Sequence, residues 1–198
     1  MPFFLCARRS ALLLGLLAIL SFYSASSVIA ADVNEPRFDA EGNLLLPDAG
    51  YREWIYVGTP VTPNDMNAGK APFPEFHNVY IRPADWAHFK KTGAFQDGTM
   101  LIKELISVGS KAAVSGQGYF MGDFIGLEAT IKDAKRFPKE PGNWAYFSFS
   151  QEDHSLPLKE KASAFPTAAC AACHQAAAAD DMVFTQYYPI LRAAKPKK

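Results

Sequence analysis

The chain has 198 residues, of which 20 are basic, 20 are acidic and 49% are hydrophobic. A chain of this length can bury a hydrophobic core as one domain without disulfide bonds. Its balanced charge argues against nucleic acid and against an anionic membrane surface as partners, because both would favour an extended cationic face.

The first thirty residues have the pattern of a signal peptide. Arg8 and Arg9 precede an apolar stretch over 11–20, and small residues lead to Val28-Ile29-Ala30. This stretch is about half as long as a membrane span requires, and the small-x-small pattern predicts cleavage after Ala30. We therefore expect an exported, periplasmic protein that has no membrane segment once residues 1–30 are removed. An uncleaved N-terminal anchor is the alternative.

Short elements come first in the mature chain. Residues 51–56 predict a helix, and residues 59–74 form a loop rich in Pro and Asn. The pattern of Asn78–Arg82 predicts a short strand, and residues 83–91 predict a helix that ends before Gly93.

Three longer strands are expected next. The sequence "GTMLIKELISVGS" (98–110) predicts a strong strand, and the small and polar residues of 109–118 predict the turn after it. The sequence "GYFMGDFIGLEATIKD" (118–133) is a returning strand, and "NWAYFSFS" (143–150) is a third, with alternating faces. This order predicts an α+β fold in which an antiparallel β-sheet packs with helices.

The alanine-rich segment 166–179 predicts a helix that carries Cys170, Cys173 and His174 as C-x-x-C-H. A disulfide across this spacing would close almost no loop, so it would add little stability. Three chemical uses remain: a redox dithiol, a zinc site, or covalent haem attachment with the histidine as iron ligand. A shorter helix is expected after Asp180 and Asp181, disturbed by Pro189.

Of the three chemical uses, only covalent haem attachment needs no residues beyond Cys170, Cys173 and His174. A thioredoxin-type dithiol belongs early in a chain, and zinc would require further ligands that the scattered histidines do not supply. On a helix the two thiols share one face, so both can reach the haem vinyl groups while His174 turns to the iron. The alanines allow a flat macrocycle to approach closely. We therefore expect haem c, held by a C-terminal helix.

The second axial position of the iron is expected to be open. Met182 is the only methionine after His174, and it lies too close in sequence to cross to the other haem face. Met100 and Met121 lie upstream in apolar surroundings that favour core packing. A five-coordinate iron favours gas binding or catalysis over simple electron transfer.

Lys103 is the unusual residue of the first long strand. Its neighbours on both faces are largely apolar. One interpretation is a solvated lysine at a sheet edge. The other is a desolvated lysine beside the haem, with an amine free to react.

Four sequences, "FQDGTMLIKEL", "GLEATIKD", "NWAYFSF" and "CAACH", together resemble the cytochrome P-460 family. The resemblance covers roughly Glu75 to Arg192. It implies a sheet-rich homodimer with haem between sheet and helices, and it places Lys103 where that family has a lysine bonded to the haem edge. It also implies oxidation of hydroxylamine at the open iron position, assisted by a distal carboxylate. Glu128 is the best match for this carboxylate, and Asp133 is a second candidate.

The resemblance implies that electrons leave to a soluble periplasmic cytochrome. The main rival is a protein like cytochrome c′-beta, which shares the fold but lacks the lysine bond and binds nitric oxide. An electron carrier with both axial positions filled is a third interpretation. The expected organisation is a signal peptide over 1–30, an N-terminal helix and loop segment over 31–74, and a haem-binding domain over 75–198.

Overall fold

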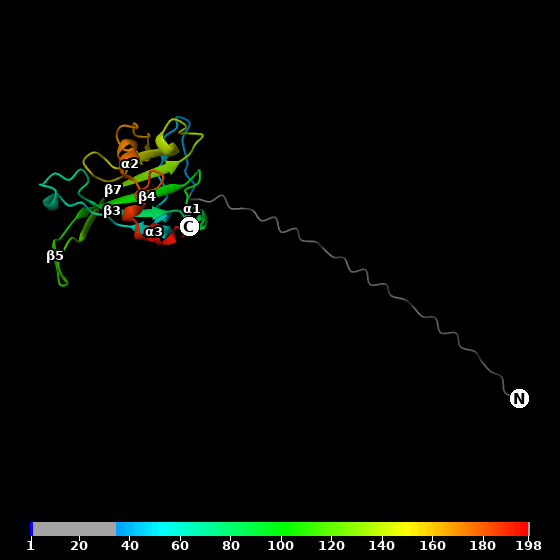
Figure 1. Ribbon diagram of the computed structural model, residues 1–198, viewed down its shortest axis with the longest axis horizontal. Coiled ribbons are helices and arrows are strands. Elements are labelled where there is room, and N and C mark those ends of the chain that lie inside the picture. The colour runs from blue at the N-terminus through cyan, green and yellow to red at the C-terminus, as the bar shows by residue number, and fades with distance from the viewer. Residues whose placement is uncertain (2–34, 198) are drawn as a thin grey trace. The chain divides into compact units, whose positions relative to one another are not determined.

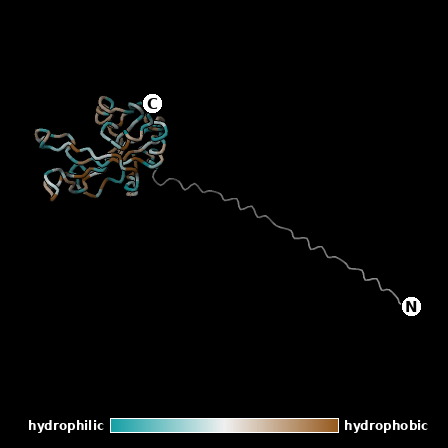
Figure 2. Tube along the Cα trace, turned by 60° about the horizontal axis from the view of Figure 1, so that its bottom comes forward, coloured by the Kyte–Doolittle hydropathy of each residue, from teal (hydrophilic) through white to brown (hydrophobic). Residues whose placement is uncertain are grey.

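The computed structural model describes Met1 and residues 35–197 (Figure 1). The predicted cleavage site at Ala30 lies outside the described residues, as does nearly all of the predicted signal peptide. Within the described part of the chain, no helix combines the length and the hydrophobicity that crossing a membrane requires. Hydrophobic segments run through the middle of the folded unit, and more hydrophilic loops surround them (Figure 2).

A five-stranded antiparallel sheet organises this unit, with the strand order β2-β3-β4-β7-β8 (Figure 1). The strands are β2 (Ile55–Gly58), β3 (Phe76–Ile81), β4 (Met100–Val108), β7 (Met121–Lys132) and β8 (Trp144–Ser148). All four strands expected from the sequence are confirmed, and β2 is an additional one. The predicted α+β fold with an antiparallel sheet is therefore confirmed.

Side chains alternate along these strands between two hydrophobic layers. One layer joins β3, β4 and β8 to the helices and contains Ile81, Leu101 and Tyr146. The other contains Ile102 and Phe147, and the N-terminal segments of the unit cover it. Because paired residues of antiparallel strands point to the same face, the register Lys103↔Glu128↔Ser148 places these three side chains on the first layer. We call this side of the sheet the helix face.

Three α-helices contribute to the helix face. Helix α1 (Pro83–Thr92) begins at Pro83 and ends at Gly93, whose φ of 72° is readily adopted only by glycine, as the sequence predicted. Helices α2 (Ala171–Ala177) and α3 (Pro189–Ala194) follow β8. Each helix buries a residue in this layer.

The remaining elements are short. Strands β1 (Leu44–Leu45) and β9 (Lys161–Ala162) pair with each other, as do β5 (Ala112–Ala113) and β6 (Gly116–Gln117) within the predicted turn. Single turns of 3₁₀-helix are η1 (Ala49–Glu53), η2 (Asn64–Met66), η3 (Pro141–Asn143) and η4 (Thr185–Tyr187).

Three predicted helices differ from the structure. The prediction of a helix over 51–56 is wrong, because Ile55–Gly58 forms β2 and pairs with β3. Only the 3₁₀ turn η1 precedes this strand. The helix over 166–179 is shorter than expected, because α2 begins at Ala171 and turns precede it. Pro189 begins α3 instead of disturbing a helix, since the first helical position does not need the N–H that proline lacks.

Candidate functional site

The C-x-x-C-H residues lie at the start of α2. Cys170 is the N-cap of this helix, and Cys173 and His174 lie within its first turns. Both thiols are free; Cys173 is exposed and Cys170 is half-buried. Burial raises the pKa of the Cys170 thiol, and the negative charge of Glu128 raises it further. The thiols are therefore available for covalent attachment, and neither is used in a disulfide.

The imidazole of His174 is oriented by a backbone carbonyl. Its Nδ1 lies 2.6 Å from the carbonyl oxygen of Met182. A carbonyl can only accept a hydrogen bond, so Nδ1 carries the proton and Nε2 keeps its lone pair. Tyr146 and Phe184 pack against the ring, each with a centroid distance of 4.5 Å. Burial lowers the pKa of His174, which favours the neutral form that binds metals.

Lys103 and Glu128 form an ion pair on the helix face of the sheet. They are directly opposite each other on β4 and β7, and Nζ lies 2.5 Å from Oε2. Each side chain is 26% exposed, and the ammonium group also lies 5.5 Å from the ring centroid of Phe73. Strand β4 is the central strand of the sheet, so the interpretation of Lys103 as a solvated edge residue is wrong.

The ion pair and the C-x-x-C-H residues belong to one region of the protein. The positive charge of Lys103 lowers the pKa of His174, whereas the negative charge of Glu128 raises it. The same two charges act in the same sense on the pKa of the Cys170 thiol, which Glu128 raises and Lys103 lowers, and there Glu128 has the larger effect. Tyr146, on the helix face of β8, packs against the His174 ring, and Cys170 packs against the same hydrophobic layer. The structure therefore brings Lys103, Glu128, Cys170 and His174 together from three separate elements.

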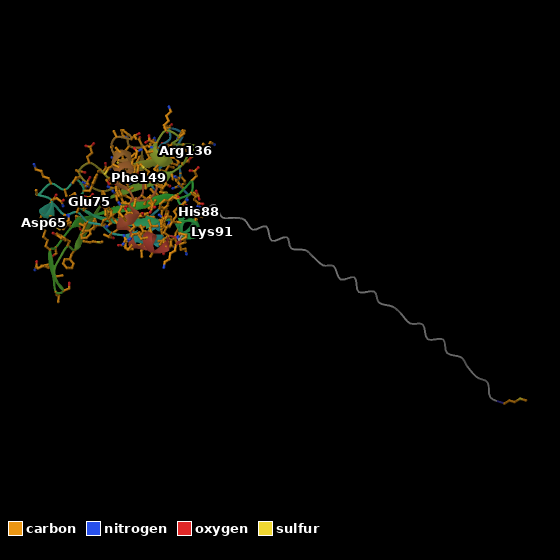
Figure 3. All side chains as sticks on the ribbon, in the orientation of Figure 1. Asp65, Glu75, His88, Lys91, Arg136 and Phe149 are labelled. Carbon is orange, nitrogen blue, oxygen red and sulfur yellow. The ribbon has the colours of Figure 1, made fainter. Side chains whose placement is uncertain are left out.

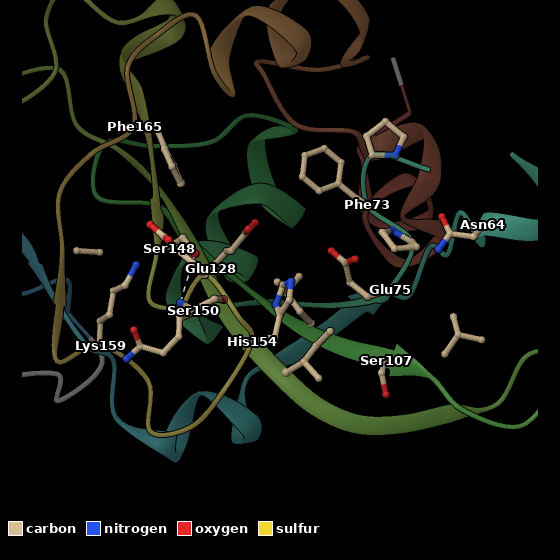
Figure 4. A pocket seen from close by; sticks show the side chains of 18 of the residues that line it. Asn64, Phe73, Glu75, Ser107, Glu128, Ser148, Ser150, His154, Lys159 and Phe165 are labelled. Carbon is tan, nitrogen blue, oxygen red and sulfur yellow. Dashed lines mark hydrogen bonds between the residues drawn. The ribbon is translucent and has the colours of Figure 1, made fainter. Parts of the chain in front are cut away.

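An open cavity of about 1050 Å³ begins beside this region (Figure 4). Glu128 and Ser148 line it from the sheet, Phe73 and Glu75 from the loop before β3, and Phe165 from the segment before α2. Figure 4 shows the side chains of Phe73 and Glu75 on one side of the cavity and that of Phe165 on the other. The two thiols and His174 do not line the cavity. Glu128 does line it, and its charge also acts on the Cys170 thiol, so this residue lies between the cavity and the C-x-x-C-H helix.

Glu75 is a second carboxylate of the cavity. It is only 7% exposed, and its Oε1 lies 3.2 Å from Nε2 of His77. Burial alone would raise its pKa, but hydrogen bonds from His77 and from the backbone, with a smaller contribution from the charge of Lys103, outweigh burial, so the pKa of Glu75 is lowered. Figure 3 shows Glu75 and Asp65 at the end of the sheet away from His88 and Lys91 on α1.

Asp133 lies in the turn after β7 and does not line the cavity. Its Oδ1 accepts hydrogen bonds from the backbone N–H groups of Lys135 and Arg136, at 3.0 and 2.9 Å. Its Oδ2 lies 3.3 Å from Nε of Arg136. The structure thus places Asp133 where it stabilises a turn and does not bring it to the Lys103–Glu128 pair.

The sequence predictions missed Glu75, Phe73 and Phe165. Phe73 and Phe165 lie in irregular segments, where no periodicity indicates which way a side chain points. Glu75 directly precedes β3 and His77 is two residues further on, and residues two apart in extended backbone point to the same side. This spacing is the signal that could have identified the pair.

The donor set fits a covalently attached haem. Two free thiols three residues apart can each form a thioether, and the free Nε2 of His174 can bind iron. The neighbouring cavity offers space for a flat macrocycle and a small ligand. Among the described residues, no group of three or more His, Cys, Asp and Glu side chains could hold a bare metal ion.

Comparison with known proteins agrees with this site. The family model of cytochrome P460 matches residues 48–185. A search of curated proteins found no match. The matched segment includes the strands of the sheet, the Lys103–Glu128 pair and the C-x-x-C-H helix. Because the match covers most of the chain, the protein belongs to the cytochrome P460 family, which implies a haem c cofactor.

Proposed function

We propose that the protein is a periplasmic c-type haem enzyme that oxidises hydroxylamine or a related small nitrogen compound. The observation that carries this proposal is the direct pairing of Lys103 with Glu128, on the sheet face that also meets His174. A lysine and a carboxylate at this place can modify the haem edge and accept protons from a substrate.

The chain's own residues have separate roles in holding the haem. Cys170 and Cys173 would anchor the ring through thioether bonds, and His174 would bind the iron through Nε2 while the carbonyl of Met182 holds its Nδ1 proton. Lys103 would form a third link in the enzyme, once its amine has lost its proton. When bound, the haem would supply the redox chemistry, with an iron able to bind a small nitrogen compound and to accept its electrons.

Glu128 is the proton acceptor in this proposal. Oxidation of hydroxylamine breaks N–H bonds, so each electron pair that leaves the nitrogen must be accompanied by protons. The carboxylate of Glu128 lines the cavity and can take them up. The electrons then pass to a soluble periplasmic cytochrome. We also propose that the protein acts as a homodimer.

The Lys103–Glu128 ion pair also favours a second candidate function. A lysine held as an ammonium ion by a carboxylate at 2.5 Å has no free electron pair to attack the haem edge. Without the lysine link, the site would resemble that of a nitric oxide binder. The cavity wall supplies apolar contacts for such a ligand from Leu105, Ile125 and Phe165.

Peptide mapping of the full-length protein, produced with haem-attachment machinery, separates the two functions. Haem on a peptide with Lys103, as well as on the peptide with Cys170 and Cys173, together with hydroxylamine turnover, supports the enzyme. Haem on the C-x-x-C-H peptide alone, with nitric oxide binding and no turnover, supports the binder. A low-spin spectrum without reaction with either compound contradicts both.

Substitution of the proposed base gives the second test. Glu128→Gln should lower the rate of hydroxylamine oxidation by about 10²–10⁴-fold, because it removes a positioned proton acceptor but preserves the side-chain shape. The matched control is Glu160→Gln, since Glu160 is exposed and does not line the cavity. Equal rates for the two variants would contradict the role of Glu128.

A further inference from the structure

A tight turn after α2 presents the carbonyl that orients His174. The N–H of Val183 donates to the carbonyl of Asp180 at 2.7 Å, which closes a four-residue turn. Asp181 and Met182 occupy its two central positions. The carbonyl of Met182 therefore takes no part in closing the turn, and it accepts the hydrogen bond from Nδ1 of His174.

The backbone of this turn is strained. The φ angles of Asp181 and Met182 are 42° and 67°, both in the left-handed region. Positive φ at both central positions is typical of type I′ turns, which prefer Asn and Gly there. An aspartate tolerates this region, whereas a methionine does so rarely. A turn with this sequence needs contacts from outside to hold its conformation.

The sheet supplies those contacts through Lys132, the last residue of β7. Its Nζ lies 2.8 and 3.0 Å from the two carboxylate oxygens of Asp181 and 2.9 Å from the carbonyl oxygen of Gly142. The lysine side chain is only 16% exposed, and its ammonium group lies 5.5 Å from the ring centroid of Trp144. A partly desolvated ion pair of this kind is stronger than one on the surface.

Packing holds the same turn from the other side. Gly142, in η3, is in close contact with this turn. A Cβ atom added to Gly142 would lie 3.0 Å from Cγ of Met182 and 3.1 Å from Oδ1 of Asp181. The side chain of Met182 is also buried in the hydrophobic layer of the helix face. The turn is thus tied to the sheet by charge and by packing.

We infer that Lys132 and Asp181 are positioning residues for His174, the proposed iron ligand. By holding the strained turn against the sheet, their ion pair places the Met182 carbonyl at 2.6 Å from Nδ1 of His174. A strong hydrogen bond from Nδ1 makes Nε2 a better electron donor to the metal. The inference rests on the proposed attachment of haem, but it does not depend on which small molecule the protein binds.

The variants Lys132→Met and Asp181→Asn test this inference in the full-length, haem-loaded protein. Each variant removes one charge of the ion pair. The methionine keeps an apolar side chain beside Trp144. The asparagine readily adopts the positive φ that position 181 has in the turn. The reduction potential and the iron–histidine stretching frequency are measured. We expect the donor strength of His174 to fall, which shifts the ferric-to-ferrous equilibrium about tenfold toward ferrous iron. For a one-electron couple this raises the potential by about 59 mV.

Two further variants serve as controls. Lys132→Arg keeps the charge and should restore most of the wild-type potential and frequency. Lys90→Met also removes a lysine that lies over a tryptophan, at 5.5 Å from the ring of Trp86, but on helix α1 instead of the strand that holds the turn. It should leave both readouts unchanged.

The outcomes are distinct for this inference and for the proposed function. Unchanged potential and frequency in both Lys132→Met and Asp181→Asn would overturn the positioning role, even if the wild type oxidises hydroxylamine. The same shift in Lys90→Met would overturn it as well. Absence of covalent haem in the wild type would instead refute the proposed haem attachment on which both rest.

Discussion

Asp85 connects α1 to the start of β4, the strand that carries Lys103. Its side chain is fully buried and accepts hydrogen bonds from Nε and Nη2 of Arg82, at 2.7 and 3.1 Å. The same carboxylate accepts from the side chain of Gln96 and from the backbone N–H of Met100, at 3.2 and 3.1 Å. It therefore neutralises a buried guanidinium and fixes the first residue of the strand.

We predict that Asp85→Ala lowers the free energy of unfolding by about 3–5 kcal/mol. Removing one partner of a buried ion pair costs about this much, because the other charge remains without its counter-charge. Arg82 keeps contacts with the carbonyl of Gly98 and with Glu35, which offset part of the loss. The N–H of Met100 loses its acceptor, which adds about 1–3 kcal/mol before the structure relaxes.

This loss is large beside the total stability of a domain, which is about 5–15 kcal/mol. Urea unfolding followed by circular dichroism measures it, provided that the slope with denaturant stays equal between variants. Asp123→Ala is the matched control, because Asp123 is exposed on β7, and it should change stability by no more than about 0.5 kcal/mol. A loss below about 1 kcal/mol for Asp85→Ala would refute the reasoning.

Two further predictions concern the cavity side of the sheet. The lowered pKa of Glu75 means that its ionisation stabilises the fold above its ordinary pKa of 4.5, and that this stabilisation is lost as the pH falls through the lowered value. Glu75→Gln should therefore flatten the acid side of the stability profile, measured by urea unfolding between about pH 3 and 6; an unaltered profile would contradict the contribution of Glu75. Gly126→Ala should cost about 1–3 kcal/mol in thermal unfolding, because the new Cβ would lie 2.1 Å from Oγ of Ser150 and 3.1 Å from Cδ1 of Leu105. The double variant with Ser150→Gly should recover much of this loss, and a single variant with wild-type stability would contradict the close contact.

Local patterns in the sequence were enough to predict most of the longer elements. The alternation of apolar and polar side chains identified β4, β7 and β8. Pro83 and Gly93 marked the two ends of α1. The C-x-x-C-H spacing indicated the chemistry of α2 before any fold was known. These signals depend on residues a few positions apart, which is why they can be read from the chain itself.

Tertiary structure decided which of these residues meet. Lys103 and Glu128 are 25 positions apart, and only the register of β4 with β7 places them opposite each other. The tautomer of His174 depends on a carbonyl whose turn is held by a lysine from β7. The cavity role of Glu75 likewise follows from packing, since its side chain lies in an irregular loop.

The sequence by itself thus determined four of the five strands of the sheet, the sheet class and the residues able to attach haem. The structure decided the ion pair, the orientation of the imidazole and the separation of Asp133 from the cavity. The physical reason is that secondary structure follows from short-range sterics and side-chain periodicity. Distances between remote side chains depend instead on strand register and on how strained turns are held by the packed layers.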